Sequence, residues 1–242
     1  MRTGIIVQAR IFSKRFPKKI FKKIYLNYKV IDFLLSRIKK TKRIDYFILA
    51  VPTKDKKKFF NIANKYKFKL ETGPENNVLK RFYLAAKKYK LDTIIRCTSD
   101  SPLMDSSILQ KSLKIFNKKK VDYLNNIIIP SYPLGIHIEI FNFRSLSKAF
   151  KFSDKRACLE HVTPFIYMNK DQFKIHTLKN KKNLSNYRFT IDYPSDLNFL
   201  KKLIQKSRKG INVTFKQIIE IIKKNPNSNK YRRNFKNRFS IA

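Results

Sequence analysis

The chain alternates short apolar runs with segments whose apolar residues recur at helical spacing, and this alternation limits the folds open to it. The apolar runs, rich in Ile, Val and Phe, predict strands at 3–9, 44–51, 68–71, 93–98, 123–125, 137–143, 173–178 and 188–191. The segments of helical period predict helices at 31–40, 55–65, 78–89, 106–117, 145–150, 156–168, 196–207 and 215–223. Strands that alternate with helices are typical of α/β layers over a mainly parallel sheet. The sequence therefore predicts an α/β fold.

Length and composition favour one soluble domain. The chain has 242 residues, of which 43% are hydrophobic, and the predicted elements continue to about residue 224. We therefore expect a single domain over 1–224. From residue 225 the chain is rich in Asn and Lys with almost no apolar period, which predicts a basic, disordered tail over 225–242. No apolar run approaches the roughly 18 residues that would span a bilayer, so we expect no membrane insertion.

The formal net charge of +40 raises the question of a polyanionic partner. The basic residues are mostly Lys, are spread over every segment and are accompanied by abundant Ile, Asn, Phe and Tyr. Adenine- and thymine-rich codons encode this set of residues, so we interpret the charge as a solvated basic surface. A nucleic-acid-binding protein is the alternative, and it predicts Lys and Arg concentrated on one face with interleaved aromatic residues.

The start of the chain and its two cysteines indicate the cellular compartment in which we expect the protein. Met1 leads directly into a strand-like run, without the charged leader, apolar stretch and cleavage site of an export signal. Cys97 and Cys158 lie far apart without metal-ligand spacing, which argues against a disulfide framework and against a zinc site. We expect a cytoplasmic protein.

The loop after the first predicted strand combines cationic and hydroxyl side chains over residues 10–19. Arg10, Arg15 and Lys19 offer positive charge to phosphate groups, and the hydroxyl of Ser13 offers a further hydrogen-bond donor. A loop of this kind can wrap a triphosphate. The alternative interpretation is one more basic loop in a very basic protein.

Two aspartates follow predicted strands in a chain where carboxylates are scarce. Asp100 lies just after the strand at 93–98, and Asp192 follows the strand at 188–191. In open α/β sheets, ligands gather at the carboxyl ends of the strands. Mg²⁺ is commonly held by one or two carboxylates together with phosphate oxygens. These residues are therefore candidate Mg²⁺ ligands, although helix caps and turns also favour aspartate.

A third group of polar residues consists of Glu139, Glu160 and His161. Such side chains can hold an acceptor sugar or orient its hydroxyl group. A lone His beside a segment that ends in proline is more often structural. The sequence contains no Gly-rich dinucleotide fingerprint, Walker loop or nucleophile elbow.

Seven segments, in their order and spacing, form a pattern far more specific than any one of them. They are IIVQAR (5–10), SKRFP (13–17) with Lys19, NVLKRFYLAA (77–86), IRCTSDSPLMD (95–105), YPLG (132–135), EHVTP (160–164) and RFTID (188–192). Together they resemble the spore coat polysaccharide biosynthesis protein F family, over about residues 4–205. That family is a branch of the cytidylyltransferases, which include the CMP-Kdo and CMP-sialate synthetases.

The resemblance implies a Rossmann-like three-layer α/β/α fold of the glycosyltransferase-A type, with a mixed, mainly parallel sheet. It implies transfer of CMP from CTP to a sugar acid with release of pyrophosphate, for surface polysaccharide synthesis. Mg²⁺ is the implied cofactor, and a homodimer is a fair expectation.

The resemblance also assigns roles to individual residues. The implied catalytic residues are Lys19, Arg15 and Asp100, and the implied Mg²⁺ ligands are Asp100 and Asp192. The nucleotide would be bound by Arg10, Ser13, Lys14, Arg81 and Arg96. The acceptor would be bound by Gly135, His137, Glu139, Glu160 and His161.

Several positions depart from the family pattern. Phe12 and Lys18 stand where the family has glycine, which lets the backbone approach phosphates. A Gly-Gly turn is missing at Leu26-Asn27, where Asn27 is able to adopt a left-handed conformation at some cost. Further departures are Asn77 for an acidic residue, Ser99 for glycine and His137 for aspartate. They raise a second hypothesis, a catalytically weakened relative that binds nucleotide, for which Phe12 would fill the phosphate site.

Overall fold

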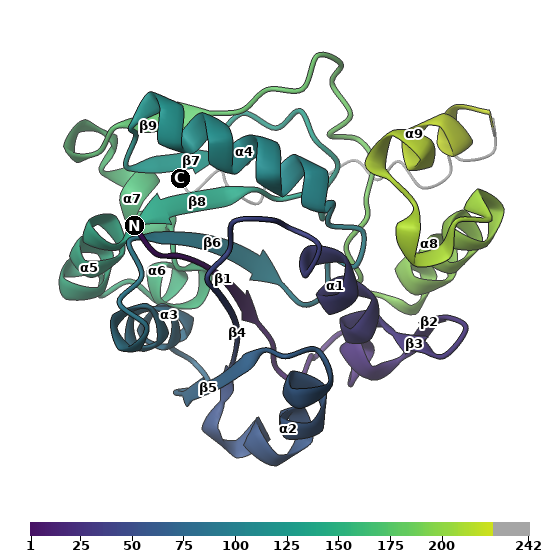
Figure 1. Ribbon diagram of the computed structural model, residues 1–242, viewed down its shortest axis with the longest axis horizontal. Helices are drawn as coiled ribbons and strands as arrows, with labels where there is room; N and C mark the ends of the chain where they lie inside the picture. Colours follow the sequence, from purple (N-terminus) through teal and green to yellow (C-terminus); the bar gives the residue numbers. More distant parts are fainter. Residues whose placement is uncertain (225–242) are drawn as a thin grey trace.

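The computed structural model describes residues 1–224, and a seven-stranded sheet forms its centre (Figure 1). The predicted tail over 225–242 lies outside the described residues. In spatial order the strands are β5 (Lys69–Gly73), β4 (Tyr46–Pro52), β1 (Thr3–Gln8), β6 (Thr93–Thr98), β8 (Glu139–Asn142), β7 (Tyr123–Asn125) and β9 (Ile175–Thr177). Strand β8 runs antiparallel to both of its neighbours, and every other pair in this sheet is parallel. The sheet is therefore mixed and mainly parallel, as predicted.

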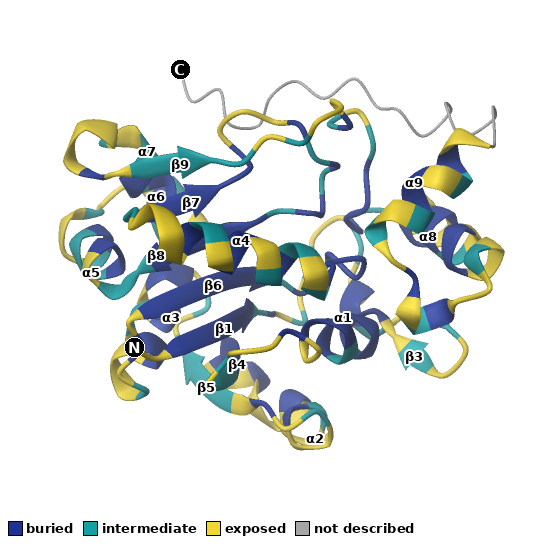
Figure 2. Cartoon of the chain, turned by 45° about the horizontal axis from the view of Figure 1, so that its top comes forward, coloured by how far each residue is buried: buried dark blue, intermediate teal, exposed yellow. Residues whose placement is uncertain are grey.

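Helices cover both faces of the sheet. One face packs against α1 (Val30–Ile38), α2 (Lys56–Lys65) and α4 (Ser106–Lys119). The other packs against α3 (Val78–Lys88), α5 (Phe143–Phe152), α6 (Arg156–His161) and α7 (Pro164–Met168). Figure 2 shows the central strands buried while the outer sides of the helices are exposed. The described residues thus form the predicted three layers.

Strand β1 illustrates why the sequence forms these layers. Ile5 and Val7 pack on the α1 side of the sheet, whereas Ile6 packs on the α3 side, and all three are fully buried. Successive side chains of a strand point to opposite faces, so the middle of a strand covered by helices on both sides is largely apolar.

A third hydrophobic cluster lies beyond the layers, at one end of the molecule (Figure 1). It joins α8 (Pro194–Ser207) and α9 (Phe215–Lys223) to a hairpin of β2 (Lys23–Tyr25) and β3 (Tyr28–Lys29). The predicted elements include no such hairpin. Short 3-10 helices complete the described elements, at Lys19–Phe21 (η1), Thr53–Asp55 (η2), Lys170–Gln172 (η3) and Gly210–Asn212 (η4).

The turn of the hairpin contains a residue in the left-handed conformation. Leu26, rather than Asn27, takes up the left-handed conformation in the turn, with φ 45°. Leu26 is also 73% exposed, so its side chain adds little to the hydrophobic cluster. Its β-carbon is strained in this region of φ, which explains why glycine suits the position.

Two predicted elements differ from the structure. The segment 188–191 is not a strand of the sheet, because it forms a single bridge, between Arg188 and Leu134. Its backbone instead bonds to loops, and the Ile191 amide donates to the Asp100 carbonyl at 2.9 Å. The helix predicted over 156–168 is broken at Val162, which has φ 72°, before Pro164 begins α7. Proline cannot continue a helix because its nitrogen carries no hydrogen and its ring clashes with the preceding turn.

Candidate functional site

The two candidate metal aspartates lie side by side at the carboxyl end of the sheet. Asp100 lies two residues after the end of β6. The segment leading to Asp192 passes beside it, held there by the bond from the Ile191 amide to the Asp100 carbonyl. The irregular path of this segment, which made the strand prediction wrong, therefore brings the second aspartate to the first.

Lys19 joins these two aspartates through its side-chain ammonium. Its Nζ lies 2.7 Å from Asp100 Oδ2, 3.1 Å from Asp192 Oδ1 and 2.5 Å from the carbonyl of Ile191. Lys19 begins η1, and only 11% of its side chain is exposed. Three oxygens thus converge on one buried cation.

Arg15 adds a second cation at the rim of this group. Its Nη2 lies 2.7 Å from Asp192 Oδ1, and its guanidinium lies over the ring of Tyr193 at 5.6 Å from the centroid. The side chain is 41% exposed. Arg15 therefore faces solvent while it remains paired with Asp192.

Two residues that sequence reasoning missed, Arg188 and Asp196, fix the position of Asp192. Arg188 pairs with Asp192 Oδ2 through Nη2, and its Nε donates to Asp196 Oδ1 at 3.1 Å. The other carboxylate oxygen of Asp196 accepts the amides of Asp192 and Tyr193, at 2.8 and 2.9 Å. A signal was available, because proline at the first helical turn followed by an acidic residue marks a helix start.

These contacts shift the pKa values of Asp192 and Arg15. Burial acts to raise the pKa of Asp192, but the charge of Lys19 and hydrogen bonds from Arg15, Lys19 and Arg188 hold that pKa well below its ordinary value. The hydrogen bond to Asp192 is the main cause that raises the pKa of Arg15. Asp192 is therefore ionised throughout the physiological range.

The donor set fits a hard divalent cation. The oxygens of Asp100, Asp192 and Ile191 already surround the single charge of Lys19, and Mg²⁺ prefers oxygen ligands. In the part of the chain that the structure describes, no group of three or more His, Cys, Asp and Glu residues could hold a metal. A cation here would thus depend on two carboxylates and on oxygens from a ligand, as is usual for Mg²⁺ bound with phosphates.

Arg96 and Glu139 form a second, fully enclosed ion pair. They lie opposite each other on β6 and β8, and Glu139 also accepts hydrogen bonds from Thr163 Oγ1 and, at 2.9 Å, from the Tyr123 hydroxyl. Burial opposes ionisation of Glu139, yet the charge of Arg96 and these hydrogen bonds keep its pKa below the ordinary value. Nucleotide binding by Arg96 and acceptor binding by Glu139 stay predictions, since each charge is already paired with the other.

The remaining acceptor candidates lie around this pair. Burial lowers the pKa of His137, although the charges of Glu139 and Asp100 oppose the shift. Gly135 has φ 102°, and a β-carbon there would lie 2.6 Å from backbone atoms of Phe189 and Thr190. Glycine is therefore required where this turn packs against the segment that leads to Asp192.

Of the nucleotide candidates in the first loop, Arg10 pairs with α6. Arg10 Nη2 lies 3.7 Å from Glu160 Oε1, and both side chains are more than a third exposed, so the pairing is weak. Ser13 is half-buried, while Lys14 and His161 are exposed.

Arg81 on α3 is buried and incompletely paired. Its Nη1 reaches the carbonyls of Ala9 and Ala50 at 3.4 Å, and its Nε has no hydrogen-bond partner among the described residues. Burial, together with the nearby charge of Arg10, lowers the pKa of Arg81 to about 10.

The residues that depart from the family pattern take ordinary structural places. Phe12 is 60% exposed, so its ring is not buried inside the phosphate loop. Lys18 has φ 54°, a conformation that favours glycine. Asn77 caps α3 by accepting the Lys80 amide at 2.8 Å, as an acidic residue would. Ser99 is buried beside Asp100.

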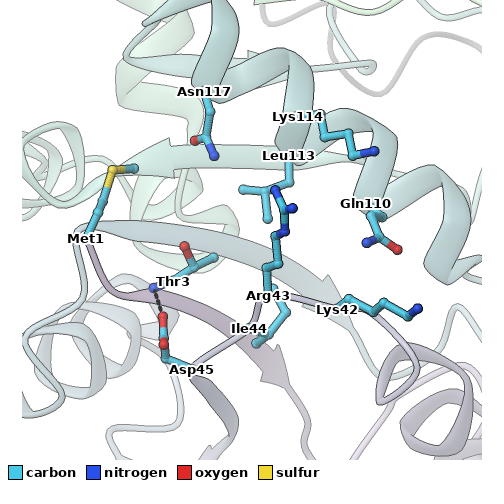
Figure 3. A pocket seen from close by; sticks show the side chains of 10 residues that line it. All are labelled: Met1, Thr3, Lys42, Arg43, Ile44, Asp45, Gln110, Leu113, Lys114 and Asn117. Carbon is cyan, nitrogen blue, oxygen red and sulfur yellow. Dashed lines mark hydrogen bonds between the residues drawn. The ribbon is translucent and has the colours of Figure 1, made fainter.

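A hollow of about 380 Å³ lies at the opposite end of the strands (Figure 3). Lys42, Arg43 and Lys114 line it, and at its floor the Asp45 carboxylate accepts the amide of Thr3 at 2.7 Å. Thr3 begins β1, whereas the aspartate pair lies beyond the carboxyl ends of the strands. The two ends of a six-residue strand such as β1 lie about 20 Å apart. The hollow is thus distinct from the aspartate site.

Comparison with known proteins shows the family of the chain. The profile of the Cytidylyltransferase family matches residues 4–222. An uncharacterized protein of Methanocaldococcus jannaschii is 36% identical over 91% of this chain and 90% of its own length. Spore coat polysaccharide biosynthesis protein SpsF of Bacillus subtilis is 28% identical over 92% of this chain and 95% of its own length.

A solved structure agrees with these sequence matches. A cytidylyltransferase from Leptospira borgpetersenii superposes with a TM-score of 0.89 at 30% identity, covering 97% of this chain and 98% of its own. The mixed sheet, its helical layers and the match over almost the whole described chain lead to one conclusion. This protein belongs to the cytidylyltransferase family.

Proposed function

We propose that this nucleotidyltransferase transfers CMP from CTP to a sugar acid and releases pyrophosphate, in the synthesis of surface polysaccharide or another glycan. The observation that carries the proposal is the convergence of Lys19 and Arg15 on Asp100 and Asp192 at the carboxyl end of the sheet. The relative named for polysaccharide biosynthesis supports the glycan context. The exposed cations Arg10 and Lys14 of the same loop would add positive charge for the phosphates of CTP.

The transfer consists of one in-line displacement. An oxygen of the acceptor forms a bond to the α-phosphorus of CTP while the bond from that phosphorus to the bridging oxygen of the β-phosphate breaks. The electron pair of the broken bond leaves with pyrophosphate, and the proton of the acceptor hydroxyl passes to solvent. Negative charge therefore grows on the leaving group, where cationic side chains are most effective.

Each residue of the site has a task in this displacement. Lys19 and Arg15 would bind the phosphates and stabilise the charge of the departing pyrophosphate. Asp100 and Asp192 would hold Mg²⁺, which when bound supplies charge neutralisation and orientation of the phosphates. Arg188 helps to keep Asp192 ionised, and Asp196 holds the segment in place by accepting the Asp192 amide.

The experiment is pyrophosphate release from purified protein with Mg²⁺. Each of the four nucleoside triphosphates is offered with a panel of sugar acids and with matched neutral sugars. We expect release with CTP and one class of sugar acid, and a loss on the order of 10²-fold or more for Asp100→Ala. Equal release with neutral sugars would overturn the sugar-acid assignment, and release with another nucleotide would overturn the choice of CTP.

The weakened-relative hypothesis predicts a different result in the same assay. CTP would raise the melting temperature of the protein, but pyrophosphate would not be released with any acceptor. The exposure of Phe12 argues against this hypothesis, because the side chain expected to fill the phosphate site is not buried there.

The nucleic-acid hypothesis finds less support in the distribution of charge. Exposed lysines lie on α2 and α4, which cover one face of the sheet, and also on α3, which covers the other. They do not gather on one face among the described residues.

No helix in this part of the chain is both long and apolar enough to cross a membrane. The cytoplasmic location and the homodimer stay predictions.

A further inference from the structure

The aspartate site already holds cations of the protein itself. Asp192 Oδ1 accepts from both Lys19 and Arg15, and Oδ2 accepts from Arg188. Asp100 Oδ2 accepts from Lys19. The ammonium of Lys19 thus occupies the space between the carboxylates that a metal ion would need.

The charges of this group balance without a metal. Three carboxylates, those of Asp100, Asp192 and Asp196, are paired with three cations, those of Lys19, Arg15 and Arg188. A divalent cation that entered would add two charges to a neutral group and would compete with Lys19 for the same oxygens. Electrostatics therefore opposes binding of the metal alone.

The three cations differ in how they are held. Arg188 is held on two sides, by Asp192 and Asp196, and only 5% of its side chain is exposed. Arg15 is 41% exposed, and Lys19 reaches the carboxylates from the start of η1 on a long, flexible stem. A triphosphate at the loop would attract both of these cations strongly.

We propose that Lys19 and Arg15 are internal counter-cations that block divalent metal binding until a nucleoside triphosphate draws them away from Asp100 and Asp192. Metal and nucleotide then bind with positive coupling, and the nucleotide-free protein holds little metal. The part of the inference that concerns the nucleotide rests on the proposed function. The competition between Lys19 and the metal does not, because it concerns only groups of this chain.

The test is Mn²⁺ binding to the nucleotide-free protein, measured by calorimetry and by the rise in melting temperature on adding Mn²⁺. We expect weak binding to the unsubstituted protein and binding at least about tenfold tighter to Lys19→Met, because a like charge has been removed from the metal position. Lys19→Arg keeps the charge and should bind as weakly as the unsubstituted protein. Lys22→Met removes an exposed charge three residues away and should change nothing.

A double variant locates the bound ion. Lys19→Met combined with Asp100→Asn should lose the gain in Mn²⁺ affinity, since the metal then lacks one of its carboxylates. If Lys19→Met proves unstable, Lys19→Gln serves in its place, with the melting temperature without metal as the check on folding.

The outcomes separate this inference from the proposed function. Tight Mn²⁺ binding to the unsubstituted protein, unchanged in Lys19→Met, would overturn the inference even if CTP turnover is intact. A gain confined to Lys19→Met would support it even if pyrophosphate release fails with every acceptor.

Discussion

Replacing Glu139 with glutamine removes one partner of the buried Arg96–Glu139 pair while keeping the shape of the side chain. Only 9% of the Arg96 side chain and 2% of the Glu139 side chain are exposed, so the guanidinium would keep its charge in a site that water barely reaches. Breaking a buried pair by removing one partner costs about 3–5 kcal/mol of folding free energy. Unit charges about 4 Å apart attract by about 4 kcal/mol at an effective dielectric constant of about 20, which is the same order.

Urea and thermal unfolding measure this loss directly. For a domain of this size, about 1 kcal/mol shifts the melting temperature by about 2–4 °C, so Glu139→Gln should melt about 6–20 °C lower. Adding Arg96→Met should recover most of the loss, because the unpaired charge is then gone and the introduced amide can still accept from Tyr123 and Thr163. Glu220→Gln on the exposed side of α9 is the matched control and should leave stability unchanged.

The same variant separates the structural role of Glu139 from the predicted acceptor-binding role. A loss below about 1 kcal/mol would refute the claim that Arg96 depends on this carboxylate. If that small loss came with a large rise in KM for the acceptor, the predicted acceptor-binding role would replace the structural one.

Two further predictions concern neighbouring positions. Burial lowers the pKa of His137 in the folded protein. The free energy of unfolding should therefore be highest above the unfolded-state pKa of about 6.5 and should fall as the pH drops below that value. Unfolding titrations of His137→Gln between about pH 5 and 8 should lack this fall. Gly135→Ala should cost about 1–3 kcal/mol in backbone strain and should also shift Phe189, and with it the segment that carries Asp192. Gly210→Ala, also at positive φ but against a Tyr25 ring, should lose stability without a matching loss of kcat, and equal kcat losses in both variants would contradict this reasoning.

Sequence pattern was sufficient where structure depends on near neighbours in the chain. The apolar runs in β1 and β4 and the mostly apolar β6 indicated strands, and helical spacing indicated the layers that cover them. The position of Asp100 after a buried strand placed it at the end of the sheet where ligands collect. These features follow from side-chain periods of a few residues, which the sequence displays directly.

Only the tertiary structure decided which of these residues meet. Lys19 contacts Asp100, 81 residues away in the sequence, and Asp192, 173 residues away. Contacts between residues so far apart leave no local pattern in the sequence. The segment before Asp192 has the apolar pattern of a strand, yet it bonds to loops, because it packs against the turn at Gly135. Residue types and their local periods therefore determined the fold class and the candidate ligands. The path of the chain between distant segments determined that Lys19 lies between Asp100 and Asp192.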